Sequence, residues 1–441
     1  MDVFATAAQA MQSVFNEDAD NLAKTTGFIK RERKITGSKF IKTLLFAGLQ
    51  KLCPSVEACT RSGFSQQLYI SAQGLDKRFT KTSCEFVKCV LERALSKTLC
   101  AKKHLDADIL NRFNAIYIND CSVIGLPDEL KTIWAGTGGS GNASKASLKL
   151  DTSLELKTGQ LKVHLLDGKH ADNKCLSAQQ TIQKGELRLQ DLGYFNLARM
   201  KKQSKAGGYW VSRLQARTCV TQVDGTAIDL TYFLKNIAKD QYSHFEMDVL
   251  VGSQEQVNAR LLLWKLPQEA AARRRAKLTK NAKKQGRIPK KSTLVLCDWN
   301  IFITNTEKDK LTLEECFLLY GVRWQIELLF KLWKNYSGLG HSRSKKPYRI
   351  LCEIYLKLLV VLFQHWIVLT SLWGKPKRSL VKGTQMLREQ SARLAECINH
   401  QDSLIALLKE FSKRFEYGCS LNTRKKKPNT TDQLIHGYQY A

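Results

Sequence analysis

Acidic residues, closely paired cysteines and long uncharged apolar stretches are all scarce in this chain of 441 residues. Its 40 Asp and Glu are outnumbered by 70 Lys and Arg, which gives a formal net charge of +30 with neutral histidines. A positive field of this size says nothing about the fold, but it attracts polyanions, with nucleic acid first and anionic membrane surfaces second. The remaining question is which polyanion the chain binds and what chemistry it performs on it.

The 13 cysteines include no C-x-x-C pair. The closest two, Cys84 and Cys89, have no Cys or His couple nearby to complete a tetrahedral site, so we do not expect zinc. An odd number of scattered cysteines is typical of reduced thiols, which indicates a cytoplasmic protein. The N-terminus has an acidic second residue and no basic segment, so it does not resemble a signal peptide.

No stretch is apolar enough throughout to predict a membrane span. The most apolar one, residues 351–373, contains Glu353, Lys357 and His365, which are costly in a bilayer. We expect a buried helix there instead. Because 43% of the residues are hydrophobic, the chain can bury a core, and its length suggests about two to four domains. These properties exclude global disorder and a small disulfide scaffold.

Residues 1–105 are predicted to be helical, because apolar residues recur along them at helical spacing. Two short helical segments lie on either side of Gly63, and the second carries the basic residues Lys77 and Arg78. This arrangement resembles a helix-turn-helix, although simple packing in a helical bundle explains it equally well.

From residue 106 to residue 214 the pattern alternates between strands and helices, which predicts a mixed α/β domain. The predicted elements are strands at 113–126, 187–191 and 207–214, a hairpin at 148–166 that turns at Lys157-Thr158-Gly159, and helices at 178–184 and 195–203.

The α/β pattern is interrupted by residues 215–291, which we predict to be a β-rich insertion with a basic end. It resumes in residues 292–345 with a strand at 294–305 and a long helix, and residues 346–441 are predicted to be helical. Residues 273–291 carry ten Lys and Arg and no acid, beginning with Arg273, Arg274 and Arg275. A solvated basic helix or a localisation-type patch explains this run about as well as DNA contact does.

The long helix, predicted over residues 320–335, carries four polar groups within a stripe roughly 60° wide at about 100° per residue. The four are Tyr320, Arg323, Glu327 and Lys334. Most other positions are apolar, and we expect them to be buried, including Trp324 and Leu328 on one flank. The polar stripe is thereby forced into the protein or a cleft. A structural ion-pair network is the alternative to a functional site around Glu327.

Two further carboxylates come at the ends of predicted strands. Asp120 interrupts an apolar strand, where an unpaired carboxylate would be costly, and Asp191 ends a strand just before Gly193. Turn or N-cap chemistry is the alternative for Asp191. Three carboxylates around two Mg²⁺ ions suit phosphodiester chemistry, because one ion activates the attacking water or 3′-hydroxyl and the other stabilises the leaving oxygen. Hard oxygen ligands favour Mg²⁺, or Mn²⁺ as a substitute, over Zn²⁺.

Three blocks, residues 118–127, residues 190–195 and the spacing Tyr-x2-Arg-x3-Glu-x6-Lys from residue 320, resemble the catalytic blocks of bacterial DDE transposases of the insertion-sequence-four family. They occur in the family's order, and the resemblance covers roughly residues 30–370. It implies an α/β RNase H-like catalytic domain with a mixed sheet, interrupted by a β-rich insertion and flanked by helical N-terminal and C-terminal regions. It also implies that Asp120, Asp191 and Glu327 are the catalytic residues and hold two Mg²⁺ ions.

By the same resemblance, Tyr320, Arg323 and Lys334 contact phosphates of the transposon end beside the scissile bond. Trp299 and Trp324 occupy positions where related enzymes hold a flipped base, with core packing as the alternative for both. The Gly-rich segment 135–148 lacks the Gly-Lys-Ser/Thr of a nucleotide-binding loop, so ATP binding is not expected. We expect this segment near the DNA end, where Lys145 and Lys149 are available for phosphates.

We therefore expect a transposase that binds terminal inverted repeats, cleaves there by metal-dependent hydrolysis and joins the 3′-hydroxyl ends to target DNA, with hairpin ends as intermediates. Double-stranded DNA is the expected partner, a homodimer the expected synaptic form, and the nucleoid the expected location, with no membrane involved. We expect the helical residues 1–105 to form a DNA-binding domain and the helical residues 346–441 to pair the protomers. The alternatives are an RNase H-like nuclease without strand transfer and an inactive, transposase-derived DNA-binding protein.

Overall fold

The computed structural model of the chain describes residues 2–31, 34–101, 105–137, 145–339, 342, 344, 346–375, 377–422 and 434. The chain divides into two compact units. Unit 1 comprises Met1–Asp106, Asp120–His170 and Trp324–Asp432, and unit 2 comprises Ala107–Asn119, Ala171–Arg323 and Gln433–Ala441. Each unit is thus assembled from segments that are far apart in the sequence.

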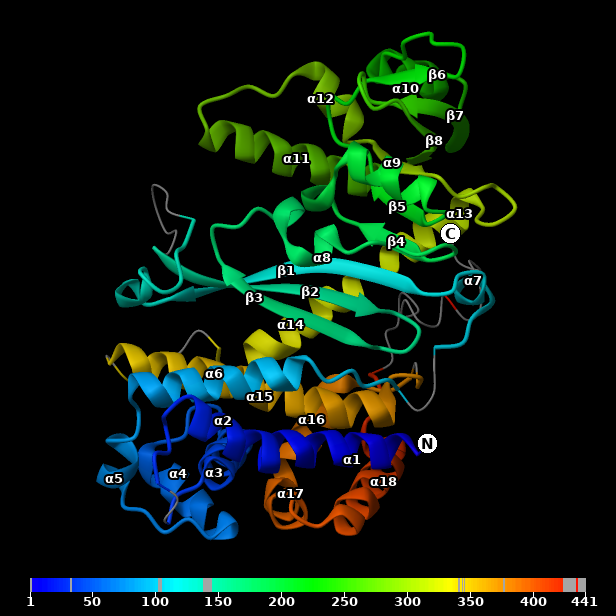
Figure 1. Cartoon of the computed structure of the whole chain (residues 1–441). Helices are drawn as coiled ribbons and strands as arrows, with labels where there is room; N and C mark the ends of the chain where they lie inside the picture. The colour runs from blue at the N-terminus through cyan, green and yellow to red at the C-terminus, as the bar shows by residue number, and fades with distance from the viewer. Residues whose placement is uncertain are drawn as a thin grey trace. The chain divides into compact units, whose positions relative to one another are not determined.

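Helices from both ends of the sequence make up most of unit 1 (Figure 1). The N-terminal ones are α1 (Val3–Ser13), η1 (Val14–Asp18), α2 (Ala19–Thr25), α3 (Gly37–Gln50), α4 (Val56–Gly63), η2 (Phe64–Gln66), α5 (Ala72–Asp76) and α6 (Lys81–Leu95). The others are η3 (Asp128–Leu130), α14 (Trp324–Ser337), α15 (Pro347–Leu372), α16 (Leu380–Glu389), α17 (Ser391–Cys397) and α18 (Gln401–Gly418). The helical character predicted for residues 1–105 is confirmed over the residues described.

The centre of unit 1 is α15, which packs against α1, α3, α6 and α18. Phe363 on α15 is fully buried, and its ring lies edge-on to those of Phe15 and Phe46, at 5.7 and 6.1 Å between centroids. Among the described residues, α15 is the one helix long and apolar enough to cross a membrane, but its apolar residues are buried inside the protein. The predicted buried helix is therefore confirmed.

Unit 1 also contains a hairpin of two antiparallel strands, β2 (Ala146–Glu155) and β3 (Leu161–Asp167). The chain reverses where Lys157-Thr158-Gly159 predicted a turn. Gly159 has a positive φ of 71°, and a Cβ there would lie 2.4 Å from a methyl carbon of Leu369 on α15. Both the backbone conformation and the close approach require glycine at this position.

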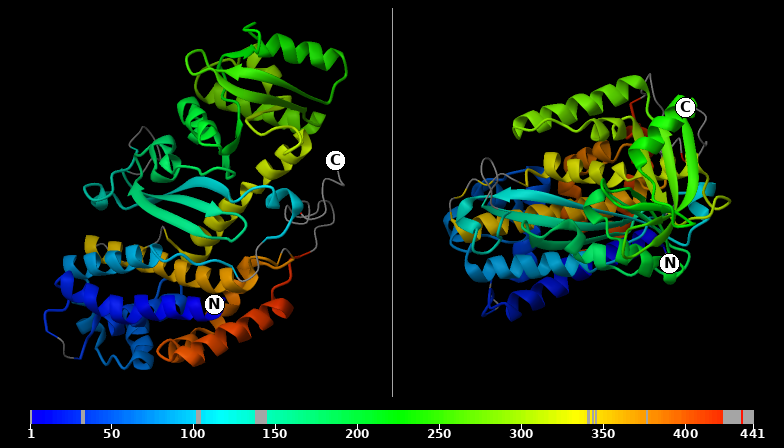
Figure 2. Two further views of the ribbon diagram at one scale, coloured as in Figure 1. Left: turned by 45° about the vertical axis from the view of Figure 1, so that its right-hand side comes forward. Right: turned by 90° about the horizontal axis from the view of Figure 1, so that it is seen from above.

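Unit 2 is built on a mixed sheet in the order β1-β4-β5-β9-β8-β7-β6. Figure 2 shows the sheet from two further directions. Its strands are β1 (Ile116–Leu126, whose second half belongs to unit 1), β4 (Leu187–Gln190), β5 (Tyr209–Arg213), β6 (Val220–Gln222), β7 (His244–Val251), β8 (Val257–Lys265) and β9 (Trp299–Thr304). The first three run parallel to one another, and the later ones pair antiparallel. The mixed α/β character predicted for this region is confirmed.

The helices of unit 2 connect these strands. They are α7 (Asp108–Asn111), η4 (Asp172–Lys174), α8 (Leu176–Gln179), η5 (Leu192–Tyr194), α9 (Leu197–Lys205), α10 (Leu230–Lys239), α11 (Gln268–Lys284), α12 (Lys291–Leu296) and α13 (Leu313–Val322). A core of buried residues that includes Trp210, Leu261 and Trp299 packs between the sheet and these helices.

Three predicted elements of unit 2 were wrong in extent or type. Within the insertion predicted to be β-rich, residues 230–239 form a helix, because the Asp229 side chain accepts hydrogen bonds from the backbone N–H groups of Thr231 and Tyr232 and so caps it. The strand predicted from residue 294 begins at Trp299, after a short helix. The helix predicted at 178–184 ends at Gln179. The Arg188 guanidinium donates hydrogen bonds to the carbonyl oxygens of Ala178 and Gln180, which would otherwise accept bonds from the next turn of the helix.

The α15 core gives a stability prediction. Phe363→Ala removes a ring that is 0% exposed, so we expect the free energy of unfolding to fall by about 3–5 kcal/mol. Phe64→Ala is the matched control, because Phe64 is 61% exposed and should lose much less. Denaturant unfolding followed by circular dichroism measures both. Equal losses in the two variants would contradict the assignment of α15 as the core helix.

Candidate active site

Asp191 and Tyr320 meet in unit 2. Asp191 directly follows β4 and occupies the position before η5, but its side chain makes no capping hydrogen bond. Tyr320 lies in the last turn of α13. The Tyr320 phenol donates a hydrogen bond to Asp191 Oδ1 at 3.2 Å. Burial and the neighbouring carboxylate raise the pKa of Tyr320 well above its ordinary value, so the phenol stays protonated and remains a donor.

Arg323 lies beside this pair. It is the C-cap residue of α13, and its guanidinium carbon is 5.7 Å from the centre of the Tyr320 ring. The positive charges of Arg323 and Arg213 act against the rise in the Tyr320 pKa. Unit 2 thus brings Asp191, Tyr320 and Arg323 together, which gives a carboxylate with a neutral donor and a cation beside it.

Asp120 and Lys334 interact in unit 1. Asp120 Oδ1 accepts a hydrogen bond from the backbone N–H of Cys121 on β1 at 2.8 Å, and the Cys121 thiol lies 3.7 Å from a carboxylate oxygen of the fully buried Asp151. Desolvation lowers the pKa of Lys334 on α14, and the negative charge of Asp120 opposes that shift. Glu327 is half-buried on the same helix, two turns before Lys334.

The single helix predicted over residues 320–335 is wrong. The structure has two helices, because α13 ends at Val322, Arg323 forms the cap and α14 starts at Trp324. The four polar residues therefore do not share one continuous helical stripe. The predicted burial is confirmed for Val322, Ile326 and Trp333 among others, but Trp324 and Leu328 are 52% and 48% exposed.

The two predicted base-binding tryptophans have opposite surroundings. Trp299, the first residue of β9, is 3% exposed and belongs to the core of unit 2, which favours the core-packing alternative for this residue. Trp324 is exposed, and the ammonium of Lys331 lies 5.4 Å from its ring centre. Trp324 is therefore the tryptophan of this pair that a base can reach.

The predicted phosphate-binding lysines also differ. Lys145 is exposed, with its ammonium 3.8 Å from Asp128, whereas Lys149 is 5% exposed and donates to the carbonyl oxygen of His170. Residues 138–144 of the Gly-rich segment lie outside the residues described.

The three consecutive arginines of α11 do not all face solvent. Arg273 is exposed and lies 3.9 Å from Glu269, one turn earlier. Arg274 donates to the backbone carbonyl of Trp299 at 3.2 Å and to the side chain of Asn300 at 2.7 Å. Arg275 pairs with Asp298. The second and third arginines thus attach α11 to the start of β9.

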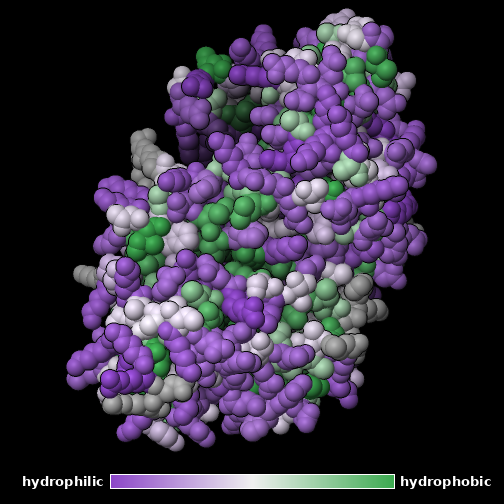
Figure 3. Space-filling view, viewed as in Figure 1, coloured by the Kyte–Doolittle hydropathy of each residue, from purple (hydrophilic) through white to green (hydrophobic). Residues whose placement is uncertain are grey.

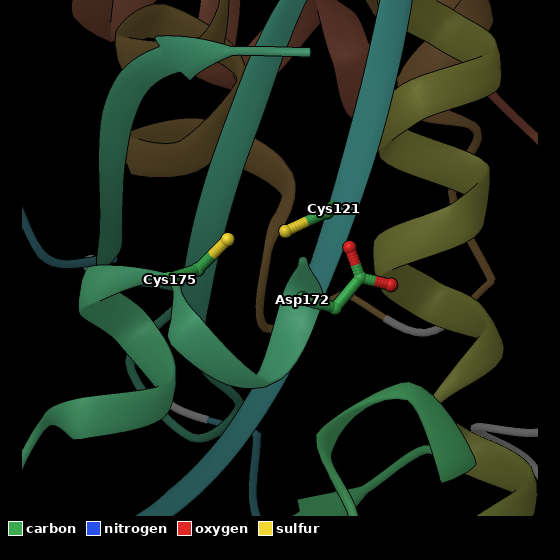
Figure 4. Close-up of side chains that lie close together, drawn as sticks. All are labelled: Cys121, Asp172 and Cys175. Atoms are coloured by element: carbon green, nitrogen blue, oxygen red, sulfur yellow. The ribbon is translucent and has the colours of Figure 1, made fainter. Parts of the chain in front are cut away.

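Sequence reasoning missed the side chains that fix the segment around η4 and α8. Asn119, which is fully buried, donates to the carbonyl of Ser177 at 2.7 Å, and Arg188 donates to two carbonyls farther along. Asp172, the first residue of η4, is labelled in Figure 4. Its carboxylate lies so close to Gly193 that a Cβ added to that glycine would be 2.8 Å from it. Asn119 and Arg188 are polar residues within apolar strands, and this pattern could have indicated buried hydrogen bonds to a neighbouring segment.

Comparison with known proteins shows the family to which the chain belongs. The family model described as a transposase DDE domain matches residues 112–363. The transposase for insertion sequence element IS231F of Bacillus thuringiensis subsp. israelensis is 26% identical, over 96% of this chain and 94% of that relative. The transposase for insertion sequence element IS1151 of Clostridium perfringens is 28% identical, over 80% of this chain and 78% of that relative.

The family match covers more than half of the chain, including β1, β4 and both helices around Arg323. A DDE domain implies an RNase H-like fold, and the mixed sheet agrees with that fold. It also implies dependence on a divalent metal ion. The chain therefore belongs to the family of DDE transposases and is an enzyme that acts on DNA.

Proposed function

We propose that this transposase binds the terminal inverted repeats of its own insertion sequence, cleaves DNA there by metal-dependent hydrolysis and joins the 3′-hydroxyl ends to target DNA. Excision passes through hairpin ends, and two copies of the chain pair the two ends. The net charge of +30 supports DNA as the partner. Hydrophilic residues cover most of the face seen in Figure 3.

The observation that carries the proposal is the register of β1 and β4. These strands run parallel, and Ile118 pairs with Leu189. Asp120 lies two residues after Ile118, and Asp191 lies two residues after Leu189. Carboxylate side chains at matching positions of adjacent parallel strands point to the same face of a sheet, near the same strand ends. Such positions suit a shared metal site.

We assign Asp120, Asp191 and Glu327 as the metal-binding carboxylates. Their oxygen donors suit Mg²⁺ or Mn²⁺, two per site, better than a soft metal ion. When bound, the metal would polarise the scissile phosphate and increase the acidity of the attacking water or 3′-hydroxyl. The protonated Tyr320 phenol orients the Asp191 carboxylate by its hydrogen bond.

Tyr320, Arg323 and Lys334 hold the phosphates that flank the scissile bond. Guanidinium and ammonium groups are natural phosphate ligands. Arg323 lies near the ring of Tyr320, which is hydrogen-bonded to Asp191, and Lys334 interacts electrostatically with Asp120. Trp324 stacks on the base displaced during hairpin formation.

Cations farther from the aspartates bind the DNA backbone. In this proposal Lys145 and Arg273, which are both exposed, contact phosphates directly. Arg274 and Arg275 serve the same surface by holding α11 in place.

The role of Glu327 gives a direct test. Glu327→Gln removes a negative charge at nearly constant volume, so strand cleavage should be lost while binding of the end persists. Cleavage of a labelled duplex that carries the inverted repeat, with Mg²⁺ or Mn²⁺, measures the first property, and gel mobility shift measures the second. Glu353→Gln on α15 is the matched control and should still cleave. Cleavage at the normal rate by Glu327→Gln would contradict the site assignment.

The lowered pKa of Lys334 predicts a pH dependence of end binding. A lysine carries its charge only below its pKa, so Lys334 should lose its charge at a lower pH than its ordinary value of 10.5 predicts. Affinity should therefore fall as the pH rises into the alkaline range, and Lys334→Arg should remove that decline because a guanidinium keeps its proton. Fluorescence anisotropy measures the two profiles. Lys331→Arg is the control, and its profile should follow that of the wild type. Superimposed wild-type and Lys334→Arg profiles would count against a phosphate-binding role for Lys334.

Strand transfer separates a transposase from an RNase H-like nuclease. Precut ends with free 3′-hydroxyls, incubated with Mg²⁺ and a supercoiled target plasmid, should become covalently joined to the plasmid. Ends that carry a 3′-deoxynucleotide are the control and should give no joined product. A chain that cuts intact ends but never joins precut ones would be a nuclease.

A further inference from the structure

Two large aromatic side chains are exposed side by side on unit 1. Phe64 and Tyr69 are 61% and 70% exposed, and their ring centroids lie 5.7 Å apart at an interplanar angle of 58°. They stand on the connection between α4 and α5. Single exposed aromatic residues are common, but a contacting pair presents a continuous apolar surface, which is typical of a binding site.

The connection that carries the pair is fixed from within. Leu68 is fully buried between the two aromatic positions, and the buried Gln66 donates from its amide to the carbonyl of Ala395 on α17 at 2.8 Å. Gly63 lies so close to the Leu68 carbonyl that a Cβ would be only 2.7 Å from it. The two rings are therefore held outward before any partner binds, which reduces the entropy lost on binding.

Basic residues outnumber acidic ones in the segment that carries the pair. From Glu57 to Lys81 the sequence has four basic residues and two acidic ones, Asp76 and the exposed Glu57. The Asp76 carboxylate is bound by Lys346 at 3.1 Å and by Arg349 at 2.5 Å, so its charge is balanced within unit 1. Arg61, one helical turn before Phe64, and Lys77 are exposed. Such a surface complements a polyanion.

We propose that the Phe64–Tyr69 pair is a wedge that contacts the bases of double-stranded DNA, while Arg61 and Lys77 bind the phosphates on either side of it. Apolar side chains inserted at a base step partly unstack it, and the bent duplex can then contact more of the protein. Aromatic faces also stack on bases without regard to sequence. This inference rests on the proposed function only in taking DNA as the partner.

The test uses the full chain and a short mixed-sequence duplex labelled with fluorescein and containing 2-aminopurine, a base that brightens when it unstacks. The double variant Phe64→Ala/Tyr69→Ala should bind about tenfold or more weakly and should abolish the brightening. The slope of log affinity against log salt should not change, because no cation has been removed. Arg61→Ala should instead reduce that slope by about 1 and keep the brightening.

Tyr417→Ala on α18 is the control, because Tyr417 is 87% exposed and belongs to no such pair; it should change neither readout. Wild-type affinity and brightening in the double variant would overturn the proposal. So would a loss of self-association, measured by sedimentation, with DNA binding intact, since the pair would then be a protein interface. If the double variant does not fold, Phe64→Gln/Tyr69→Gln replaces it, because polar side chains at these exposed positions keep the bulk but provide no apolar wedge, and the same loss of brightening is expected. No readout depends on cleavage, so a failed cleavage assay leaves this test unaffected.

Discussion

The parallel pairing of β1 with β4 is the constraint on which the proposed chemistry depends. Successive side chains of a strand point to opposite faces, so a slip of one residue would send one aspartate to the wrong side of the sheet. The observed register pairs Ile116 to Ile118 with Leu187 to Leu189, and Asp120 and Asp191 each follow two residues after the last of these pairs. The buried Asn119 and Arg188 then tie the same two strands to the segment around η4 and α8, which fixes them beyond their ladder hydrogen bonds.

Elements with strong local patterns could be predicted from the sequence. The α15 helix, the β2–β3 hairpin, the strand that contains Asp120 and the strand that precedes Asp191 all followed from periodicity and turn residues. The α10 helix could not be predicted in this way, because its start depends on one capping side chain, Asp229, within a β-like composition. The break at Arg323 was also missed, because the apolar pattern continues across it, although Gly321 was a weak signal.

The candidate site was only partly predictable for a related reason. Residue types and spacing suffice to nominate Asp120, Asp191 and Glu327, but not to say which cations are free to meet DNA. Arg274, Arg275 and Lys149 all donate to groups within the protein. Part of the large positive charge thus holds the fold together, and composition cannot separate that part from the cations that bind phosphates.

The central position of α15 bears on how the protein is synthesised. Its packing partners α1, α3 and α6 leave the ribosome long before it does, since α15 begins at Pro347. Until that helix is translated, the apolar residues of α1, α3 and α6 that pack on it lack this partner, and such surfaces invite aggregation or chaperone binding. Unit 1 is therefore completed only in the last quarter of translation, when α15 is added to helices that already pack on one another.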